Sequence, residues 1–316
     1  MTHHASLLGI EVTDDRQFRI EDYQSSTPRW CPGCGDHSIL TAFQRLLEDE
    51  QLRPEQTVFV SGIGCSGRFP HFIKTYGFHG LHGRALPVAT GIKLERPELH
   101  VFVVMGDGDC YSIGGNHWLH ATRYNIDMVA VVLDNGMYAM TKGQTSPTTP
   151  ESFPSNTQPQ GSYLRPVNPI ATTLGMTNAS FVAQTAEWIP QHLFGTLKAA
   201  YHHKGFSLVR ILQRCPIWTA AIFEEALRNP DVIELLIHDD GVYVKDLVQI
   251  YENTLYHDPR DLNRARALAE PADRIRLGVF YRNEDLPVYE EIRRLPAYTV
   301  EKKLEVLNEE LDRFAV

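Results

Sequence analysis

Five short runs of mostly β-branched and apolar residues constrain the fold of this chain more than any other feature. They lie at residues 57–62, 100–106, 128–135, 180–185 and 205–213. Such runs are typical of strands that are buried on both faces of a parallel sheet. Segments with the apolar spacing of helices separate most of them, for example residues 114–125 and 188–203. The pattern predicts an α/β fold with a mostly parallel sheet and helices on both faces.

Around this core the sequence predicts three parts. Residues 1–30 are polar and aperiodic, and are expected to form an N-terminal arm. Residues 31–217 form the α/β domain, which begins with a helix whose N-cap is expected to be Asp36. Within this domain, residues 144–169 are rich in Pro, Ser, Thr and Gln, which predicts a long ordered loop. Residues 218–316 are charged and have helical spacing, so we expect a helical C-terminal extension that packs on the outside or on a partner.

The charge and hydropathy of the chain exclude several classes of function. The 316 residues carry a net charge of -9, which argues against a surface for nucleic acid or for anionic membranes. No apolar run approaches the roughly 20 residues that a membrane-spanning helix requires. The N-terminal sequence MTHHASLLGI lacks a basic segment followed by a long apolar stretch, so we expect no secretory signal and a cytoplasmic protein.

Four of the predicted strands end in unusual sequences. Three run directly into SGIGCSGR, MGDGDCYSIGG and LDNGMYAMTKGQ, and the last one runs into QRCP. In an open parallel sheet, ligands bind beside the carboxyl ends of the strands, which meet at one edge. We therefore expect these four segments to form one composite site.

The GDG turn offers a site for a phosphate group and a metal ion. Gly106 and Gly108 flank Asp107 between a strand and a helix, so the backbone can turn sharply and approach a phosphate. Asp107 supplies a carboxylate oxygen that suits Mg²⁺ or Ca²⁺, and Asn135 supplies a second oxygen at the end of the next strand. A GDG turn alone is a weak signal, because a tight strand-to-helix turn can contain it without a ligand. The Asn-Gly turn that follows strengthens the prediction.

The cysteines suggest a second site but do not identify its occupant. Cys31 and Cys34 are three positions apart in CPGC, and the chain has too few cysteines for a disulfide scaffold. Their spacing leaves a zinc site, a redox-active dithiol and an iron–sulfur cluster open. Cys65 and Cys215 each follow a predicted strand at the composite site, so four thiolates are available. Cys110 is expected to be a small buried hydrophobic residue.

Together these motifs resemble a known family. The spacing from Asp107 to Asn135 resembles the thiamine diphosphate motif, which begins with GDG and ends with Asn. The wider sequence resembles the β subunits of the 2-oxoacid:ferredoxin oxidoreductases over residues 29–217. The matching segments are CPGCGDHSIL, GIGCSGRFPHF, HGLHGRALPVATGIKL, GDGDCYSIGGNH, LDNGMYAMTKGQTSPT and LQRCP. The resemblance implies the thiamine diphosphate-binding fold.

The resemblance also implies two metal sites. The ligands of a [4Fe-4S] cluster would be Cys31, Cys34, Cys65 and Cys215, with Cys110 left out. Iron is favoured over zinc because oxidation of a thiamine-bound intermediate requires a nearby electron acceptor. The ligands of Mg²⁺ would be Asp107, Asn135 and the backbone carbonyl of Met137.

Cofactor contacts and two catalytic side chains follow from the same resemblance. The contacts to thiamine diphosphate would come from Ile63, Gly64, Cys65, Ser66, His82, Gly108, Asp109, Ala139 and Met140. His82 and Lys142 would be catalytic, and Lys142 would hold the substrate carboxylate or stabilise developing negative charge. A histidine bonded only to the backbone and a solvated lysine are the ordinary alternatives. Arg68 and Arg84 are weaker candidates for contacts to an anionic substrate or coenzyme.

The implied reaction is oxidative decarboxylation of a 2-oxoacid. Thiamine diphosphate would act as the electron sink when CO2 leaves, the cluster would pass electrons singly to ferredoxin, and coenzyme A would accept the acyl group. The motifs resemble the members that act on 2-oxoglutarate, with reductive carboxylation of succinyl-CoA as the reverse reaction. Pyruvate or broad 2-oxoacid specificity is an alternative. A non-redox thiamine diphosphate decarboxylase or synthase and a zinc-stabilised binding module are further alternatives.

A partner is implied as well, because only one α/β domain is visible and enzymes of this family bind the cofactor between two. An α subunit would supply the second domain and the glutamate that faces the pyrimidine ring. We therefore expect an (αβ)2 heteromer in which this chain is active only with its α subunit. Ferredoxin, coenzyme A and a 2-oxoacid are its expected partners, with no nucleic acid and no membrane.

Overall fold

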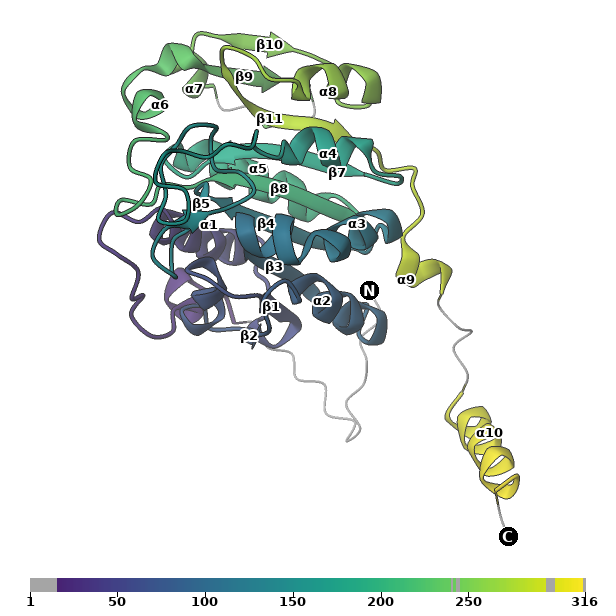
Figure 1. Ribbon diagram of the computed structural model, residues 1–316. Coiled ribbons are helices and arrows are strands. Elements are labelled where there is room, and N and C mark those ends of the chain that lie inside the picture. Colours follow the sequence, from purple (N-terminus) through teal and green to yellow (C-terminus); the bar gives the residue numbers. More distant parts are fainter. Residues whose placement is uncertain (1–15, 240, 243–244, 294–298, 315–316) are drawn as a thin grey trace.

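Nine strands form one sheet in the order β10-β9-β11-β7-β8-β4-β3-β1-β2 in the computed structural model (Figure 1). The structure describes residues 16–239, 241–242, 245–293 and 299–314. The strands are β1 (Thr57–Ser61), β2 (Tyr76–His79), β3 (His100–Gly106), β4 (Met128–Asp134), β7 (Phe181–Ala186), β8 (Phe206–Leu212), β9 (Ile233–Ile237), β10 (Thr254–Tyr256) and β11 (Ile275–Arg282). The five runs predicted from the sequence are β1, β3, β4, β7 and β8, and each is confirmed as a strand.

Strands β2, β1, β3, β4, β8 and β7 are all parallel, so their carboxyl ends lie at one edge of the sheet. Helices cover both faces, as predicted. Along β3, Phe102 and Val104 point into the apolar cluster beneath α1 (Asp36–Asp49) and α5 (Pro190–His202). Val101 and Val103 point into the opposite cluster beneath α2 (Ala85–Glu95) and α3 (Gly115–Tyr124). This alternation follows from the two-residue period of a strand.

The C-terminal part differs from the predicted helical extension. β11 pairs antiparallel with β7, and β9 and β10 continue the sheet parallel to β11. Residues 218–316 therefore contribute three strands to the sheet as well as helices such as α8 (Leu262–Ala269) and α10 (Val300–Asp312). The runs IELLI and IRLGVFYR form two of these strands, although charged segments surround them. A domain boundary at residue 217 stays a prediction.

The N-terminal arm was predicted for residues 1–30, of which residues 1–15 lie outside the described part of the chain. Its described part packs on the body. Tyr23 is fully buried, and its hydroxyl donates to the carbonyl oxygens of Leu47 and Leu52 at 2.9 and 2.8 Å. Among the residues that the structure describes, no helix has both the length and the apolar character needed to cross a membrane.

Two local predictions have different outcomes. The loop predicted for residues 144–169 is confirmed, because it runs from the short strand β6 (Gln144–Thr145) to α4 (Pro169–Gly175). β6 forms a small hairpin with β5 (Met137–Tyr138). The N-cap prediction is wrong: Gly35 is the N-cap of α1, and Asp36 is the first helical residue with a buried side chain.

Candidate active site

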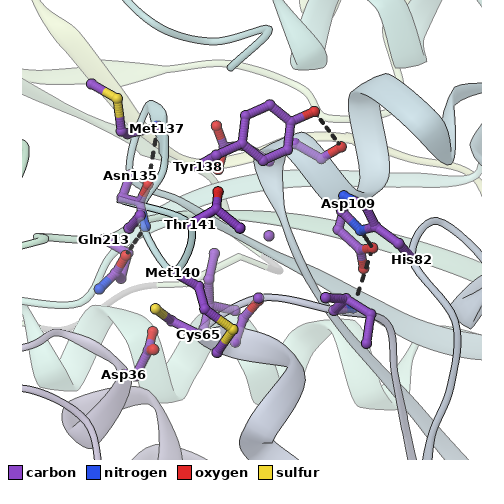
Figure 2. A pocket seen from close by; sticks show the side chains of 18 residues that line it. Asp36, Cys65, His82, Asp109, Asn135, Met137, Tyr138, Met140, Thr141 and Gln213 are labelled. Carbon is purple, nitrogen blue, oxygen red and sulfur yellow. Dashed lines mark hydrogen bonds and ion pairs between the residues drawn. The ribbon is translucent and has the colours of Figure 1, made fainter. Parts of the chain in front are cut away.

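A cavity lies beside the carboxyl ends of β1, β3, β4 and β8, where the sequence predicts the composite site (Figure 2). Its lining includes every residue predicted to contact thiamine diphosphate or Mg²⁺. These are Ile63, Gly64, Cys65, Ser66, His82, Asp107, Gly108, Asp109, Asn135, Met137, Ala139 and Met140. The parallel register of the strands thus brings the three Gly-containing turns to one place, although their roles there stay predictions.

Asp107 is buried at the floor of this cavity beside a second carboxylate. The hydroxyl of Thr148 lies 2.8 Å from Asp107 Oδ2 and 2.7 Å from Asp134 Oδ1, so it lies between the two acids. Asp134 is also paired with Arg210, whose Nε lies 2.7 Å from Asp134 Oδ2. Burial raises the pKa of Asp107 above its ordinary value, and the Asp134 carboxylate adds to this shift. A nearby cation would stabilise the ionised form of such a buried acid.

Asn135 extends from the turn after β4 into the same cavity. Its Oδ1 accepts a hydrogen bond from the Met137 backbone N–H at 3.0 Å, and its Nδ2 donates to Gln213 Oε1 at 2.9 Å (Figure 2). The intervening Gly136 has a φ of 69°, a left-handed conformation that glycine adopts without strain. The turn therefore fixes the direction of the Asn135 side chain and exposes the backbone of Met137 to the cavity.

These donors fit the metal and the cofactor that the sequence implies. A buried carboxylate, an amide oxygen and a backbone carbonyl are the oxygen ligands that Mg²⁺ takes. The turn at Gly108 cannot carry a side chain, because an added Cβ would lie 2.1 Å from the ring of Tyr138. The Tyr138 hydroxyl donates to the Gly108 carbonyl oxygen at 3.2 Å and holds the turn in place. Gly108 lines the cavity, so a phosphate group bound there could approach this backbone.

On the other side of the cavity, Asp109 joins neighbouring segments through hydrogen bonds. Its Oδ1 accepts hydrogen bonds from His82 Nδ1 at 2.5 Å, from the Gly83 N–H at 2.7 Å and from the Ile63 N–H at 3.3 Å. Its Oδ2 is buried without a hydrogen-bond partner among the described residues. Burial raises the pKa of Asp109, while the three hydrogen bonds oppose that shift. Asp109 therefore acts on the cavity chiefly by positioning His82 and the loop that begins at Gly62.

Lys142 is the predicted site residue that the structure does not bring into the cavity. Its side chain is exposed and is not among the residues that line the cavity. It lies at the tip of the β5–β6 hairpin with a φ of 78°, and its N–H donates to the Ala139 carbonyl oxygen at 3.1 Å. A catalytic role for Lys142 stays a prediction. The two arginines also stay outside this cavity: Arg68 donates to the Arg29 carbonyl oxygen and Arg84 to that of Ile113.

The loops that carry the cysteines meet at the same edge of the sheet. The Gly35 N–H donates to the Arg214 carbonyl oxygen at 3.2 Å, which joins the CPGC loop to the QRCP loop. The indole N–H of Trp30 donates to the Cys65 carbonyl oxygen at 2.7 Å. Gly35 is required here because an added Cβ would lie 2.6 Å from the buried side chain of Glu187. Three segments far apart in the sequence are thus held together by specific contacts.

The four predicted cluster ligands lie close enough to interact electrostatically. Burial raises the pKa of Cys65 to about 12, and Asp36, Cys215 and Cys31 add to that shift in this order. Burial is also the largest cause of the raised pKa of Cys34, to which Cys65 and Cys215 contribute. All are free thiols. The neighbouring cysteines thus add to the raised pKa of Cys34 and of Cys65, which suits a centre that binds thiolates, since a bound metal removes the thiol protons.

Within the described ranges, no three His, Cys, Asp or Glu side chains are grouped so that they could hold a metal ion. A cluster on the four cysteines therefore stays a prediction. Cys110 is buried in the apolar cluster on the α2–α3 face, together with Val60 and Trp118, as a small hydrophobic residue.

Sequence reasoning missed several lining residues. They are Asp36, Tyr138, Thr141 and Gln213, each of which lies within two positions of a predicted site residue. Asp36 lies beside Cys34, and burial raises its pKa to about 7. Gln213 and Asp36 flank cysteine motifs, and proximity to those motifs was the only available signal for them.

Two family descriptions match this chain. Residues 62–211 match "Thiamine pyrophosphate enzyme, C-terminal TPP binding domain". Residues 237–298 match the C-terminal segment described for "Pyruvate ferredoxin oxidoreductase beta subunit". The first range begins directly after β1 and contains β2, β3, β4, β7 and the Gly-containing turns that line the cavity, and the second contains β10 and β11.

Several curated proteins are similar over most of the chain. The 2-oxoglutarate oxidoreductase subunit KorB of Mycobacterium tuberculosis is 44% identical over 72% of this chain, and the match spans 61% of that protein's length. The 2-oxoglutarate synthase subunit KorB of Archaeoglobus fulgidus is 46% identical over 70% of this chain and 85% of its own. The 2-oxoacid:ferredoxin oxidoreductase subunit beta of a Sulfolobus species is 39% identical over 83% of this chain and 84% of its own.

A solved structure has the same fold. It is a 2-oxoglutarate:ferredoxin oxidoreductase from Magnetococcus marinus with 2-oxoglutarate, coenzyme A and succinyl-CoA bound. The two chains superpose with a TM-score of 0.78 at 33% sequence identity, over 93% of this chain and 97% of that one.

Proposed function

The chain belongs to the β subunits of the 2-oxoacid:ferredoxin oxidoreductases, and on that basis we propose that it oxidatively decarboxylates 2-oxoglutarate together with an α subunit. The observation that best supports this proposal is that the GDG turn, the Asn-Gly turn and Cys65 line one cavity. The same active site would also catalyse the reverse reaction, the reductive carboxylation of succinyl-CoA, since an enzyme accelerates both directions of a reaction.

Bound thiamine diphosphate supplies the electron sink for loss of CO2. Asp107, Asn135 and the carbonyl of Met137 would hold Mg²⁺, which neutralises the diphosphate at the buried floor of the cavity. The backbone at Gly108 would lie against the diphosphate, because Gly108 lines the cavity. Ile63, Gly64, Ser66, Ala139 and Met140 would complete the contacts to the cofactor.

His82, which lines the cavity, would act on the substrate. Its Nδ1 donates to Asp109, so the neutral ring carries its proton there and presents Nε2 as an acceptor. A histidine whose tautomer is fixed in this way can accept or return a proton at one atom. Lys142 would join the site only through movement of its hairpin or through contact with the α subunit.

Electrons would leave through a [4Fe-4S] cluster on Cys31, Cys34, Cys65 and Cys215. The contacts that join the three cysteine loops beside the cavity support this role, because electron transfer requires a short distance between cofactor and cluster. Ferredoxin would receive the electrons, and coenzyme A would accept the acyl group.

The similar proteins support 2-oxoglutarate as the substrate. Two relatives at 44% and 46% identity and the structural neighbour are named for 2-oxoglutarate. Pyruvate is the alternative, since residues 237–298 match a pyruvate ferredoxin oxidoreductase segment. We also infer an (αβ)2 assembly in the cytoplasm, in which the cavity is closed by the α subunit and receives the pyrimidine-side glutamate from it.

The test is to purify this chain anaerobically with and without its α subunit. The complex is expected to contain thiamine diphosphate and about four irons per β chain, and to reduce ferredoxin with 2-oxoglutarate and coenzyme A. The lone chain should show no turnover with either 2-oxoacid. A complex with thiamine diphosphate but no iron would indicate a non-redox decarboxylase or synthase. Zinc without thiamine diphosphate would indicate a binding module, and faster turnover of pyruvate would reassign the substrate.

A further inference from the structure

Gln213 occupies the point where the two predicted metal sites meet. It follows β8 directly, and its backbone N–H donates to the Asp134 carbonyl oxygen at 3.0 Å, which continues the β4–β8 pairing past the end of the strand. Only 1% of Gln213 is exposed, and its side chain lines the cavity (Figure 2). A buried amide needs partners at both of its ends, because an unpaired polar group is costly to bury.

Both ends of this amide are hydrogen-bonded. Its Oε1 accepts from Asn135 Nδ2 at 2.9 Å. Its Nε2 donates to Cys34 Sγ at 3.2 Å and to the Arg214 carbonyl oxygen at 2.7 Å. One side chain therefore links a predicted Mg²⁺ ligand to a predicted cluster ligand.

The surrounding contacts fix which end of the amide faces which neighbour. Asn135 already uses its Oδ1 to accept from the Met137 N–H, so it offers Nδ2 to Gln213. Gln213 must then present its oxygen to Asn135 and its N–H groups to Cys34 and Arg214. The opposite orientation would place two NH2 groups against each other and an amide oxygen against the Arg214 carbonyl oxygen.

We propose that Gln213 is a positioning residue that holds Asn135 toward Mg²⁺ and raises the reduction potential of the cluster through its N–H···S hydrogen bond to Cys34. This inference rests on the proposed function. When the cluster accepts one electron its sulfur ligands become more negative, and an N–H donor stabilises that state more than the oxidised one. No proton moves and no bond to Gln213 breaks in this step.

The test compares the co-purified α–β complex carrying wild-type Gln213, Gln213→Leu or Gln213→Glu. Leu removes all three side-chain hydrogen bonds, whereas Glu keeps the size but replaces the N–H donor with a carboxylate oxygen. Gln44→Leu is the matched control, because Gln44 is also buried but lies within α1 and does not line the cavity. The readouts are iron content and the one-electron midpoint potential of the cluster, followed by EPR.

We expect both Gln213 variants to keep their iron and to show a more negative midpoint potential, with the larger shift for Glu. A threefold to tenfold loss in the equilibrium constant for reduction is expected, and each tenfold corresponds to about 59 mV for one electron. The control should keep the wild-type potential. The Leu variant should also need more Mg²⁺ for half-maximal activity, because Asn135 loses its support, whereas the Glu variant keeps an oxygen that accepts from Asn135 Nδ2.

The outcomes separate this inference from the function on which it rests. If the wild-type complex contained no iron, that result would contradict both the predicted cluster and the proposed function. A wild-type complex with iron, together with unchanged potentials in both variants, would overturn only the role of Gln213. If the variants lose their cluster, ¹⁵N-labelled glutamine in the wild type provides the measurement. Pulsed EPR of the reduced cluster should detect coupling to that nitrogen, and its absence would overturn the inference.

Discussion

Nδ1 of His82 lies 2.5 Å from the carboxylate oxygen Oδ1 of Asp109, and this pair joins two walls of the cavity. His82 belongs to the loop after β2, whereas Asp109 follows β3. The same oxygen accepts the N–H groups of Gly83 and Ile63, so one carboxylate fixes three segments. The orientation of His82 therefore depends on the charge and position of Asp109.

Asp109→Asn is expected to lower turnover of 2-oxoglutarate by about tenfold to a hundredfold, the range typical of residues that orient a site group. The amide keeps the size of the side chain but cannot accept all three hydrogen bonds as well as a carboxylate. Steady-state ferredoxin reduction by the α–β complex measures the effect. Asp49→Asn, an exposed change on α1, is the control and should retain wild-type turnover. Equal rates for both variants would show that Asp109 does not position His82.

A second change tests the same wall from the opposite side. Gly62→Ala would place a Cβ 1.9 Å from Asp109 Oδ2, and the three hydrogen bonds at Oδ1 prevent that carboxylate from moving away freely. We expect a loss of about 1–3 kcal/mol in the free energy of unfolding and a fall in turnover like that of Asp109→Asn.

The matched control for Gly62→Ala is Gly115→Ala in the first turn of α3. An added Cβ at Gly115 meets no heavy atom within 4 Å, so this change should leave the stability unchanged or raise it by up to about 1 kcal/mol. Urea unfolding of the two variants provides the comparison. A Gly62→Ala variant as stable and active as Gly115→Ala would mean that Asp109 can relocate at little cost.

The sequence was sufficient to predict the core strands and the edge at which they meet. Each run was apolar and continuous, and the parallel topology then required the turns at Asp107 and Asn135 to lie together. The C-terminal strands could not be predicted in the same way. β11 (Ile275–Arg282) has charged residues before and within it, and its antiparallel pairing with β7 depends on contacts far apart in the chain.

The directions of individual side chains were the second feature that could not be predicted from the sequence. Asp36 has the sequence position of an N-cap, but Gly35 takes that position and Asp36 lines the cavity. Lys142 stands in a matching motif, but its side chain is exposed and does not line the cavity. Gln213 became informative only when its distances to Asn135 and Cys34 were known.

The C-terminal helix α10 contributes little to the stability of the body. None of its described residues is buried, and its apolar side chains are exposed at Val300, Leu304, Leu307 and Leu311. Removal of residues 299–316 should therefore change the free energy of unfolding of the isolated chain by no more than about 0.5 kcal/mol. Urea unfolding of the truncated and full-length chains measures the difference. A substantially larger loss would show that α10 packs on the body in solution.

Acid should destabilise the chain partly through His192. This residue lies on α5, is 2% exposed, and has its Nδ1 2.8 Å from the Thr185 hydroxyl. Burial lowers its pKa from 6.5 to about 4. Between pH 6.5 and pH 4 the unfolded chain therefore binds a proton that the folded chain does not. The stability that neutral His192 provides is complete above pH 6.5 and is lost as the pH falls toward 4.

At 1.36 kcal/mol for each unit of pKa, this loss reaches about 3 kcal/mol at pH 4. His192→Gln removes the titrating group, so the fall in the free energy of unfolding between pH 7 and pH 4.5 should be smaller by about 2–3 kcal/mol than in the wild type. The buried His203, with a pKa lowered to about 4, remains and keeps part of the acid sensitivity. The exposed His71→Gln is the control and should leave the pH dependence nearly unchanged. If His192→Gln and wild type lose stability in parallel, protonation of His192 does not limit the folded state, and the ring must reach water before global unfolding.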